Sequence, residues 1–229
     1  MQRRSWSSAE VRFLKLNYGE VMESLRRYAE RALEKGARAV ILIGSLARGD
    51  YTAFSDADVL VVSDSAPENP IERLRGYIDP STPIDVEPRV YRSEELIDMA
   101  LRGSRLAIEV VEHGKLLAGD GGVVVEVEEA LALRKLVEKA VDEYNKYRAP
   151  EAKASIEHLK RGELKVRIEG TFCFTCGFYD YIDDLKIELE DAGVQVEVRE
   201  VKEITEGVEV TFTVKGLTSR ARERLASPS

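Results

Sequence analysis

The sequence contains few of the residues from which small proteins build zinc or disulfide sites. It has only two Cys and two His. A structural zinc site needs four such ligands, and His113 and His158 lie far along the chain from Cys173 and Cys176. We therefore predict small core residues at the two Cys positions. A redox pair, or half of a zinc site shared in a dimer, is the alternative.

Long apolar runs are also missing. No stretch approaches the roughly 20 apolar residues that a helix needs to cross a bilayer. The N-terminal residues 1–6 lack the apolar segment of a signal peptide. These absences predict a cytoplasmic protein that makes no contact with a membrane.

Positive charge is in the minority. The chain has 34 Lys and Arg against 42 Asp and Glu, which gives a formal net charge of −8. Such a chain repels phosphate backbones, and no basic stripe interleaved with aromatics offsets this. Nucleic acid is therefore a disfavoured partner. Asn and Gln are scarce while Glu, Lys and Arg are abundant, a balance typical of thermophilic proteins.

The composition nevertheless supports two folded domains. Hydrophobic residues make up 44% and charged residues 33% of the chain, as in globular proteins that bury a core. A Gly-rich stretch over 119–122 indicates a boundary. We predict a first domain over 1–119, a helical connector over 120–160 and a small α+β domain over 161–229.

Residue patterns predict an α/β (α+β) fold with a mixed sheet and flanking helices in the first domain. Apolar residues at helical spacing predict a helix over 18–35. Pro83 and Pro88 indicate an edge position or bulges for the third of the strands that follow. The predicted strands cover 39–43, 57–63, 82–90 and 115–118, and further helices cover 71–77, 93–101 and 104–112.

The rest of the chain predicts a long helix and a smaller α+β domain of the order β-α-β-β. Helical spacing extends over 127–147, with a further helical piece over 151–160. The smaller domain is predicted to have a strand at 164–170, a helix at 178–191 and a hairpin of strands at 194–201 and 208–214.

Two acids stand close together at the start of the second strand. Asp56 and Asp58 are two residues apart, so a strand places both carboxylates on one face. Carboxylates this close repel each other and lower stability unless a hard divalent cation neutralises them. The pair therefore predicts a site for Mg²⁺ or Mn²⁺.

The loop after the first strand has the composition of a phosphate site. Gly44 allows a backbone to approach a phosphate closely, and Ser45 adds a hydroxyl at the start of a helical turn. Arg48 lies one turn later, where it either reaches a triphosphate or pairs with Asp50. We predict nucleotide binding by Gly44, Ser45 and Arg48.

The segment 43–50 followed by 55–59 resembles the signature of the polymerase-β nucleotidyltransferase superfamily, and most closely its minimal prokaryotic members. The resemblance covers about residues 18–118. It implies that Ser45 contacts the triphosphate, that Asp56 and Asp58 bind metal, and that a third acid on a later strand completes the site. Asp85 is the predicted third acid, with Glu87 on the same face as the alternative.

The function implied by this resemblance is transfer of a nucleoside monophosphate from a nucleoside triphosphate, with ATP expected, to a hydroxyl of a small molecule or protein. Pyrophosphate is released, and the three acids hold the metal ions. A different class of function is a nucleotide-binding or antitoxin-like module that pairs with a helical partner protein or with a second copy of the chain. The intact set of acids favours the enzyme.

Overall fold

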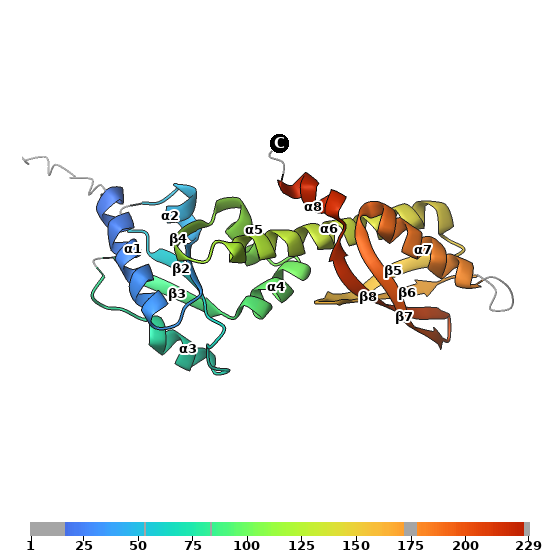
Figure 1. Cartoon of the computed structure of the whole chain (residues 1–229), viewed down its shortest axis with the longest axis horizontal. Coiled ribbons are helices and arrows are strands. Elements are labelled where there is room, and N and C mark those ends of the chain that lie inside the picture. The colour runs from blue at the N-terminus through green and yellow to red at the C-terminus, as the bar shows by residue number, and fades with distance from the viewer. Residues whose placement is uncertain (1–16, 53, 83, 172–177, 227–229) are drawn as a thin grey trace, which may run out of the picture. The chain divides into compact units, whose positions relative to one another are not determined.

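The computed structural model describes residues 17–52, 54–82, 84–171 and 178–226. The chain forms two compact units, shown in Figure 1: residues up to Val90 together with His113–Gly119, and Tyr91–Glu112 together with the residues from Asp120 onward. The change of unit after Gly119 falls at the predicted position, whereas the segment 91–112 belongs to the second unit and no division falls at 160. No helix in the described ranges is long and apolar enough to cross a membrane.

The first unit is built on a four-stranded sheet with the order β3-β2-β1-β4. The central strand β1 runs antiparallel to both β2 and β4. Pro88 lies in the edge strand β3, as predicted, where a missing N–H does not interrupt the sheet. The strands are β1 Ala39–Leu42, β2 Ala57–Val62, β3 Val86–Tyr91 and β4 Lys115–Gly119.

Three helices belong to this sheet: α1 Tyr18–Glu34, α2 Gly44–Arg48 and α3 Pro70–Tyr77. The apolar face of α1 forms a core cluster with one face of the sheet, which includes Ala57, Val59 and Val61 of β2. Side chains alternate along a strand, so Asp58 lies on the face of β2 that does not pack against α1. Helix α1 is also tied to the end of α3, because the buried Tyr28 hydroxyl donates to the Tyr77 carbonyl oxygen at 2.8 Å.

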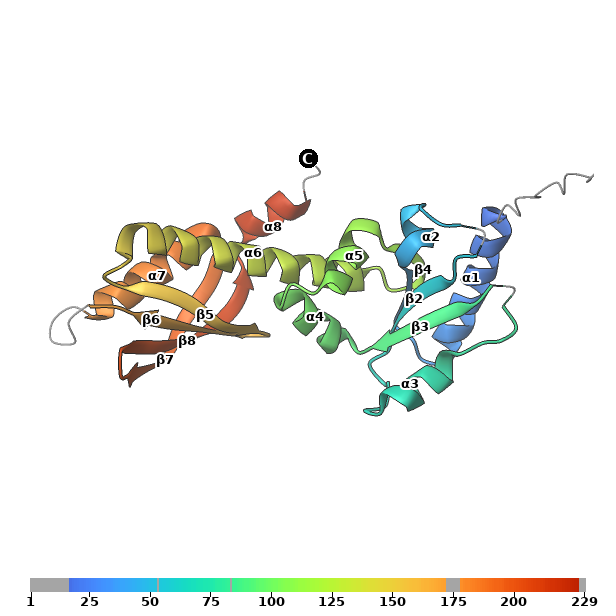
Figure 2. The same cartoon turned by 180° about the vertical axis from the view of Figure 1, so that it is seen from behind.

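The second unit contains an antiparallel sheet of the order β5-β6-β8-β7. Helices α6 and α7 lie over one face of this sheet, as Figures 1 and 2 show. Its strands are β5 Lys153–Lys160, β6 Glu163–Glu169, β7 Val194–Ile204 and β8 Gly207–Leu217. Its helices are α4 Ser93–Leu101, α5 Arg105–His113, α6 Gly122–Arg148, α7 Phe178–Ala192 and α8 Ser219–Ala226.

The predicted helical piece over 151–160 is wrong, because these residues form strand β5. The pairing with β6 shifts between Ile156 and His158, so β5 contains an irregularity at Glu157. A bulge of this kind inserts one residue and reverses the alternation of buried side chains. Ile156 and Leu159, on either side of this irregularity, then lie on the same side of β5 with the three-residue spacing of a helix, and the smaller domain gains a strand before the predicted β-α-β-β order.

Candidate functional site

The predicted site residues gather at one end of the first sheet. Leu42, the last residue of β1, pairs with Val59 of β2 on one side and with Lys115 of β4 on the other. The next residue, Ile43, donates its N–H to the Asp58 carbonyl oxygen at 3.0 Å. The loop that begins at Gly44 therefore starts directly beside the carboxylates of β2.

Gly44 and the Asp58 side chain are in direct contact. Gly44 is buried and has a φ of +72°, a conformation that residues with a side chain rarely adopt. A Cβ atom at this position would lie 2.3 Å from Oδ2 of Asp58, far inside van der Waals contact. Only Gly lets the start of α2 close against this carboxylate, and this contact joins the two halves of the predicted motif.

Helix α2 is a single short turn that presents Ser45 and Arg48. It ends at Gly49, which has a φ of +91° and donates its N–H to the Ser45 carbonyl oxygen at 2.8 Å. Ser45 is partly buried and Arg48 is exposed. Nε of Arg48 lies 3.3 Å from Oδ2 of Asp50, which is the ion pair that the sequence offered as the alternative to triphosphate binding.

An aromatic pair holds the loop that connects α2 to β2. The rings of Tyr18 and Tyr51 stack with their centroids 5.3 Å apart and their planes 13° apart. Nζ of Lys115 donates to the Tyr18 hydroxyl at 3.2 Å and lies 5.7 Å from the centroid of that ring. Helix α1, strand β4 and the loop are joined here, and the start of β2 is positioned by this packing.

The three predicted acids occupy neighbouring strand ends. Asp56 is exposed, one residue before β2, and Asp58 lies within β2 with 26% of its side chain exposed. Asp85 is exposed directly before β3, and its carbonyl oxygen accepts a hydrogen bond of 2.8 Å from the N–H of Ala57. The backbone of Asp85 is thereby fixed beside the residue that separates the two other acids.

Arg89 is a member of this site that the sequence reasoning missed. Its Nη2 atom lies 2.9 Å from Oδ1 of Asp58, so the guanidinium compensates this carboxylate across the β2–β3 pair. Glu87 and Arg89 are two residues apart in β3 and share a face. That alternation was a signal in the sequence that Arg89 faces the same side as the acids.

The donor set fits a hard divalent cation by its chemistry. Asp56, Asp58 and Asp85 offer only carboxylate oxygens, the ligands that Mg²⁺ and Mn²⁺ prefer, and the cation now beside Asp58 is Arg89. Within the described residues, no three Asp, Glu, His or Cys side chains already stand together as a metal cage. To hold an ion, these three side chains would have to come closer together, and Asp58 would have to exchange its pair with Arg89 for the ion.

The other candidate ligands lie elsewhere or cannot be placed. Cys173 and Cys176 fall outside the residues that the structure describes. His113 is in the last turn of α5, and His158 is in β5 of the second unit, where its Nε2 lies 2.7 Å from Oε1 of Glu163.

Comparison with protein families settles the class of the protein. Residues 25–218 match the model of the nucleotidyltransferase domain. The chain belongs to this nucleotidyltransferase family. The resemblance to the polymerase-β superfamily is thereby confirmed, and the protein is a nucleotidyltransferase of mixed α/β structure. A comparison with curated proteins finds no match.

Solved structures give more distant likenesses. A candidate nucleotidyltransferase from Sulfolobus solfataricus is 21% identical, with 43% of this chain and 80% of that chain covered and a TM-score of 0.31. A toxin–antitoxin complex with AMP-PNP is 20% identical over 58% of this chain and 94% of that one, with a TM-score of 0.33. A mutant of the toxin–antitoxin pair MntA–HpeT is 18% identical over 58% and 98%, with a TM-score of 0.35.

Proposed function

We propose that this nucleotidyltransferase transfers a nucleoside monophosphate from ATP to a hydroxyl group of a small molecule or protein, with Mg²⁺ or Mn²⁺ as cofactor. The acceptor oxygen forms a bond to the α-phosphorus while the bond between that phosphorus and the bridging oxygen breaks. Pyrophosphate leaves with the electron pair of the broken bond. The proton of the acceptor hydroxyl passes to a carboxylate of the site.

The observation that carries this proposal is the contact between Gly44 and Asp58. A phosphate-binding loop and a metal-binding acid serve one reaction only if a nucleotide can touch both at once. The position of Gly44, where a Cβ atom would lie 2.3 Å from Asp58 Oδ2, supports such a joint site. A protein that used its fold only as a scaffold would have no need for this close approach.

Each residue has a proposed role in the transfer. The backbone of Gly44 and the hydroxyl of Ser45 bind the triphosphate, and Arg48 exchanges its pair with Asp50 for a phosphate oxygen. Asp56, Asp58 and Asp85 hold the metal ions, and Asp85 accepts the acceptor proton. When bound, the ions neutralise the triphosphate and hold the attacking and leaving oxygens in line.

The decisive experiment follows the label of [α-³²P]ATP into cell extract in the presence of Mg²⁺. We expect the purified protein to label an acceptor. The Asp58→Asn variant should lose this labelling because a metal ligand is gone, and Asp85→Asn should lower its rate by about 10²–10⁴-fold, the usual contribution of a general base. Circular dichroism establishes that the variants fold.

Glu30→Gln is a matched control, since it neutralises an exposed acid on α1 of the same unit. Labelling by this variant should equal that of the unchanged protein. Labelling that persists at full rate in Asp58→Asn would contradict the proposed reaction.

A second candidate function is that of a nucleotide-binding or antitoxin-like module which pairs with a helical partner protein. An apolar stripe on and just after α3 favours a protein contact, because Ile71, Leu74 and Ile78 are 63%, 37% and 56% exposed at helical spacing. Titration of the purified protein with ATP and Mg²⁺ separates the two candidates. Binding without any partner supports the enzyme, whereas binding that appears only with a partner supports the module.

A further inference from the structure

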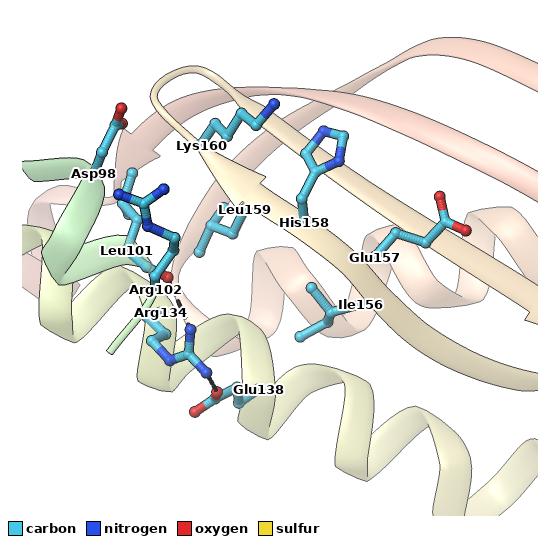
Figure 3. A pocket seen from close by; sticks show the side chains of 10 residues that line it. All are labelled: Asp98, Leu101, Arg102, Arg134, Glu138, Ile156, Glu157, His158, Leu159 and Lys160. Carbon is cyan, nitrogen blue, oxygen red and sulfur yellow. Dashed lines mark hydrogen bonds and ion pairs between the residues drawn. The ribbon is translucent and has the colours of Figure 1, made fainter. Parts of the chain in front are cut away.

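The second unit contains a cavity of about 520 Å³ that the proposed reaction does not use. It is bounded by the end of α4, by the middle of α6 and by the 156–160 segment of β5, all within this unit. Figure 3 shows the side chains that line it. Cavities of roughly 300–1,000 Å³ are the usual size for small-molecule sites, so this one has room for a ligand.

One wall of the cavity is apolar. Leu101 and Leu159 are buried, and Ile156 is partly buried beside them. In Figure 3, Ile156 and Leu159 point from β5 toward the helices. This wall offers contact to the hydrocarbon or ring portion of a ligand rather than to a fully hydrated ion.

Arg134 lines the cavity, and its side chain is held in place by contacts within the protein. Its Nη1 donates to the Leu101 carbonyl oxygen at 2.9 Å, and its Nη2 lies 2.5 Å from Oε1 of Glu138. A Cβ atom at Gly103 would lie 2.9 Å from Nε of Arg134, so the side chain is also packed closely against the backbone. These contacts restrict the guanidinium and compensate the charge of Glu138.

The other charges that already have partners add little to the cavity. Glu157 pairs with Lys165 at 3.2 Å and with Arg167 at 2.7 Å. His158 is hydrogen-bonded to Glu163 at 2.7 Å. These side chains are therefore occupied within the sheet.

Arg102 and Lys160 are the two other cationic side chains that line the cavity. Both are exposed, and the described part of the chain provides neither side chain with a hydrogen bond or an ion pair. They come from two different elements, the C-cap of α4 and the end of β5, and both line the cavity. Asp98 is the one acid of the lining that likewise lacks such a partner among the described residues, so the three unpaired side chains of the lining carry a net charge of +1.

We propose that this cavity binds a small organic anion, with Arg102 and Lys160 holding its phosphate or carboxylate group. The apolar body of the anion lies on Leu101, Ile156 and Leu159. This binding is independent of the nucleotide transfer at the first sheet, because every residue that it uses belongs to the second unit.

Calorimetric titration of the full chain with phenyl phosphate, benzoate and phenol tests the proposal. Buffer passed over a chelating resin is free of divalent ions, so none reach the acids of the first unit. We expect phenyl phosphate or benzoate to bind, and the preferred one identifies the anionic group. Phenol has the same ring without the charge, so it lacks the hydrogen bonds between a charged group and the two cations. Losing one such hydrogen bond commonly lowers the affinity about tenfold or more, and phenol should bind more weakly by at least that factor.

The variant pair Arg102→Ala with Lys160→Ala should weaken anion binding by about tenfold or more, because both charge-assisted contacts are lost. The matched control is Arg105→Ala with Lys153→Ala, which removes the same two charges from exposed positions outside the cavity. Asp98→Asn should strengthen binding, because a repulsive charge disappears.

Three results would overturn the proposal. The first is that neither anion binds the unchanged chain. The second is that phenol binds as tightly as the anions, which would leave only an apolar cavity. The third is that the control pair weakens binding as much as the cavity pair does, which would reveal a general charge effect.

Discussion

The two sheets of this protein differ in whether their charged side chains form ion pairs with one another. On the second sheet, acids and bases compensate each other across strands: Lys165 lies 2.7 Å from Glu209, and Arg167 lies 2.7 Å from Glu157. At the end of the first sheet, the side chains of Asp56 and Asp85 have no ion pair within the described ranges, and Asp58 has a single partner in Arg89. The charged side chains of the second sheet therefore form ion pairs with one another. The acids of the first sheet are largely unpaired and so remain open to a ligand, as the proposed function requires.

The matched charges of the second sheet have a measurable signature. Hydrogen bonds from Lys165 and Arg167 hold the pKa of the Glu209 carboxyl below its usual value, with Lys165 as the larger cause. These side chains come from β6 and β8, and Glu157 of β5 extends the same network. The network therefore joins three strands.

Among changes that leave the three acids in place, Gly44→Ala should have the largest effect at the first sheet. The new Cβ atom would overlap Oδ2 of Asp58, and the φ of +72° is unfavourable for Ala. We expect the free energy of unfolding to fall by about 1–3 kcal/mol. Displacing a metal ligand by even 1 Å can lower a rate about 100-fold, so labelling should decrease by at least that factor.

Gly49→Ala is the matched control for this change. Gly49 has a φ of +91° and ends the same short helix, but a Cβ atom there would meet nothing within 4 Å. The backbone strain is therefore retained without the overlap. Equal losses of labelling in the two variants would show that strain alone, and not the contact with Asp58, limits activity.

The acids of the first unit could be selected from the sequence because their spacing is regular, and their role as metal ligands stays a prediction. The period of two along a strand placed Asp56 and Asp58 together, and Ala57 and Val59 are indeed buried in the core on the opposite face. The partner of Asp58 was not predicted, because Arg89 lies 31 residues away and strand pairing brings it near. Long-range pairing is the information that local periodicity lacks.

The second unit was harder to predict for two physical reasons. The bulge in β5 gives Ile156 and Leu159 the three-residue spacing of a helix, which is consistent with the wrong assignment of 151–160 as helical. The cavity beside it depends on α4, which lies about 50 residues earlier in the chain. The long helix, by contrast, was predicted over 127–147 and forms over Gly122–Arg148, because its apolar repeat is uninterrupted.

Arg89→Ala should make the first sheet bind metal more tightly. The guanidinium competes with a cation for Asp58, and the pair is partly exposed, with 26% of the Asp58 side chain and 49% of the Arg89 side chain open to solvent. Exposed pairs contribute little, so we expect Mn²⁺ affinity to rise about two- to fivefold, measured by electron paramagnetic resonance. Arg75→Ala on the exposed surface of α3 is the control. Weaker Mn²⁺ binding in Arg89→Ala would instead assign Arg89 a supporting role.

The smallest expected effect is on the melting temperature measured as the pH is lowered. This measurement tests the ion pairs of Glu209 in the second sheet directly. The hydrogen bond from Lys165 holds the folded pKa of the Glu209 carboxyl below its ordinary value, so its ionised form stabilises the folded state. This contribution is present above the ordinary pKa of a Glu side chain and is lost as the pH falls through the lowered pKa. Glu209→Gln should therefore be less stable than the unchanged chain at pH 7, and the two melting temperatures should converge in acid.

Asp56→Asn provides the contrast from the first sheet. It removes an acid that has no ion pair within the described ranges, and repulsion with Asp58 disappears with it. Its melting temperature at pH 7 should equal or exceed that of the unchanged chain, opposite in sign to Glu209→Gln. If both variants lose stability at pH 7 to the same extent, the acids of the first sheet are matched as fully as those of the second, and the distinction between the two sheets is wrong.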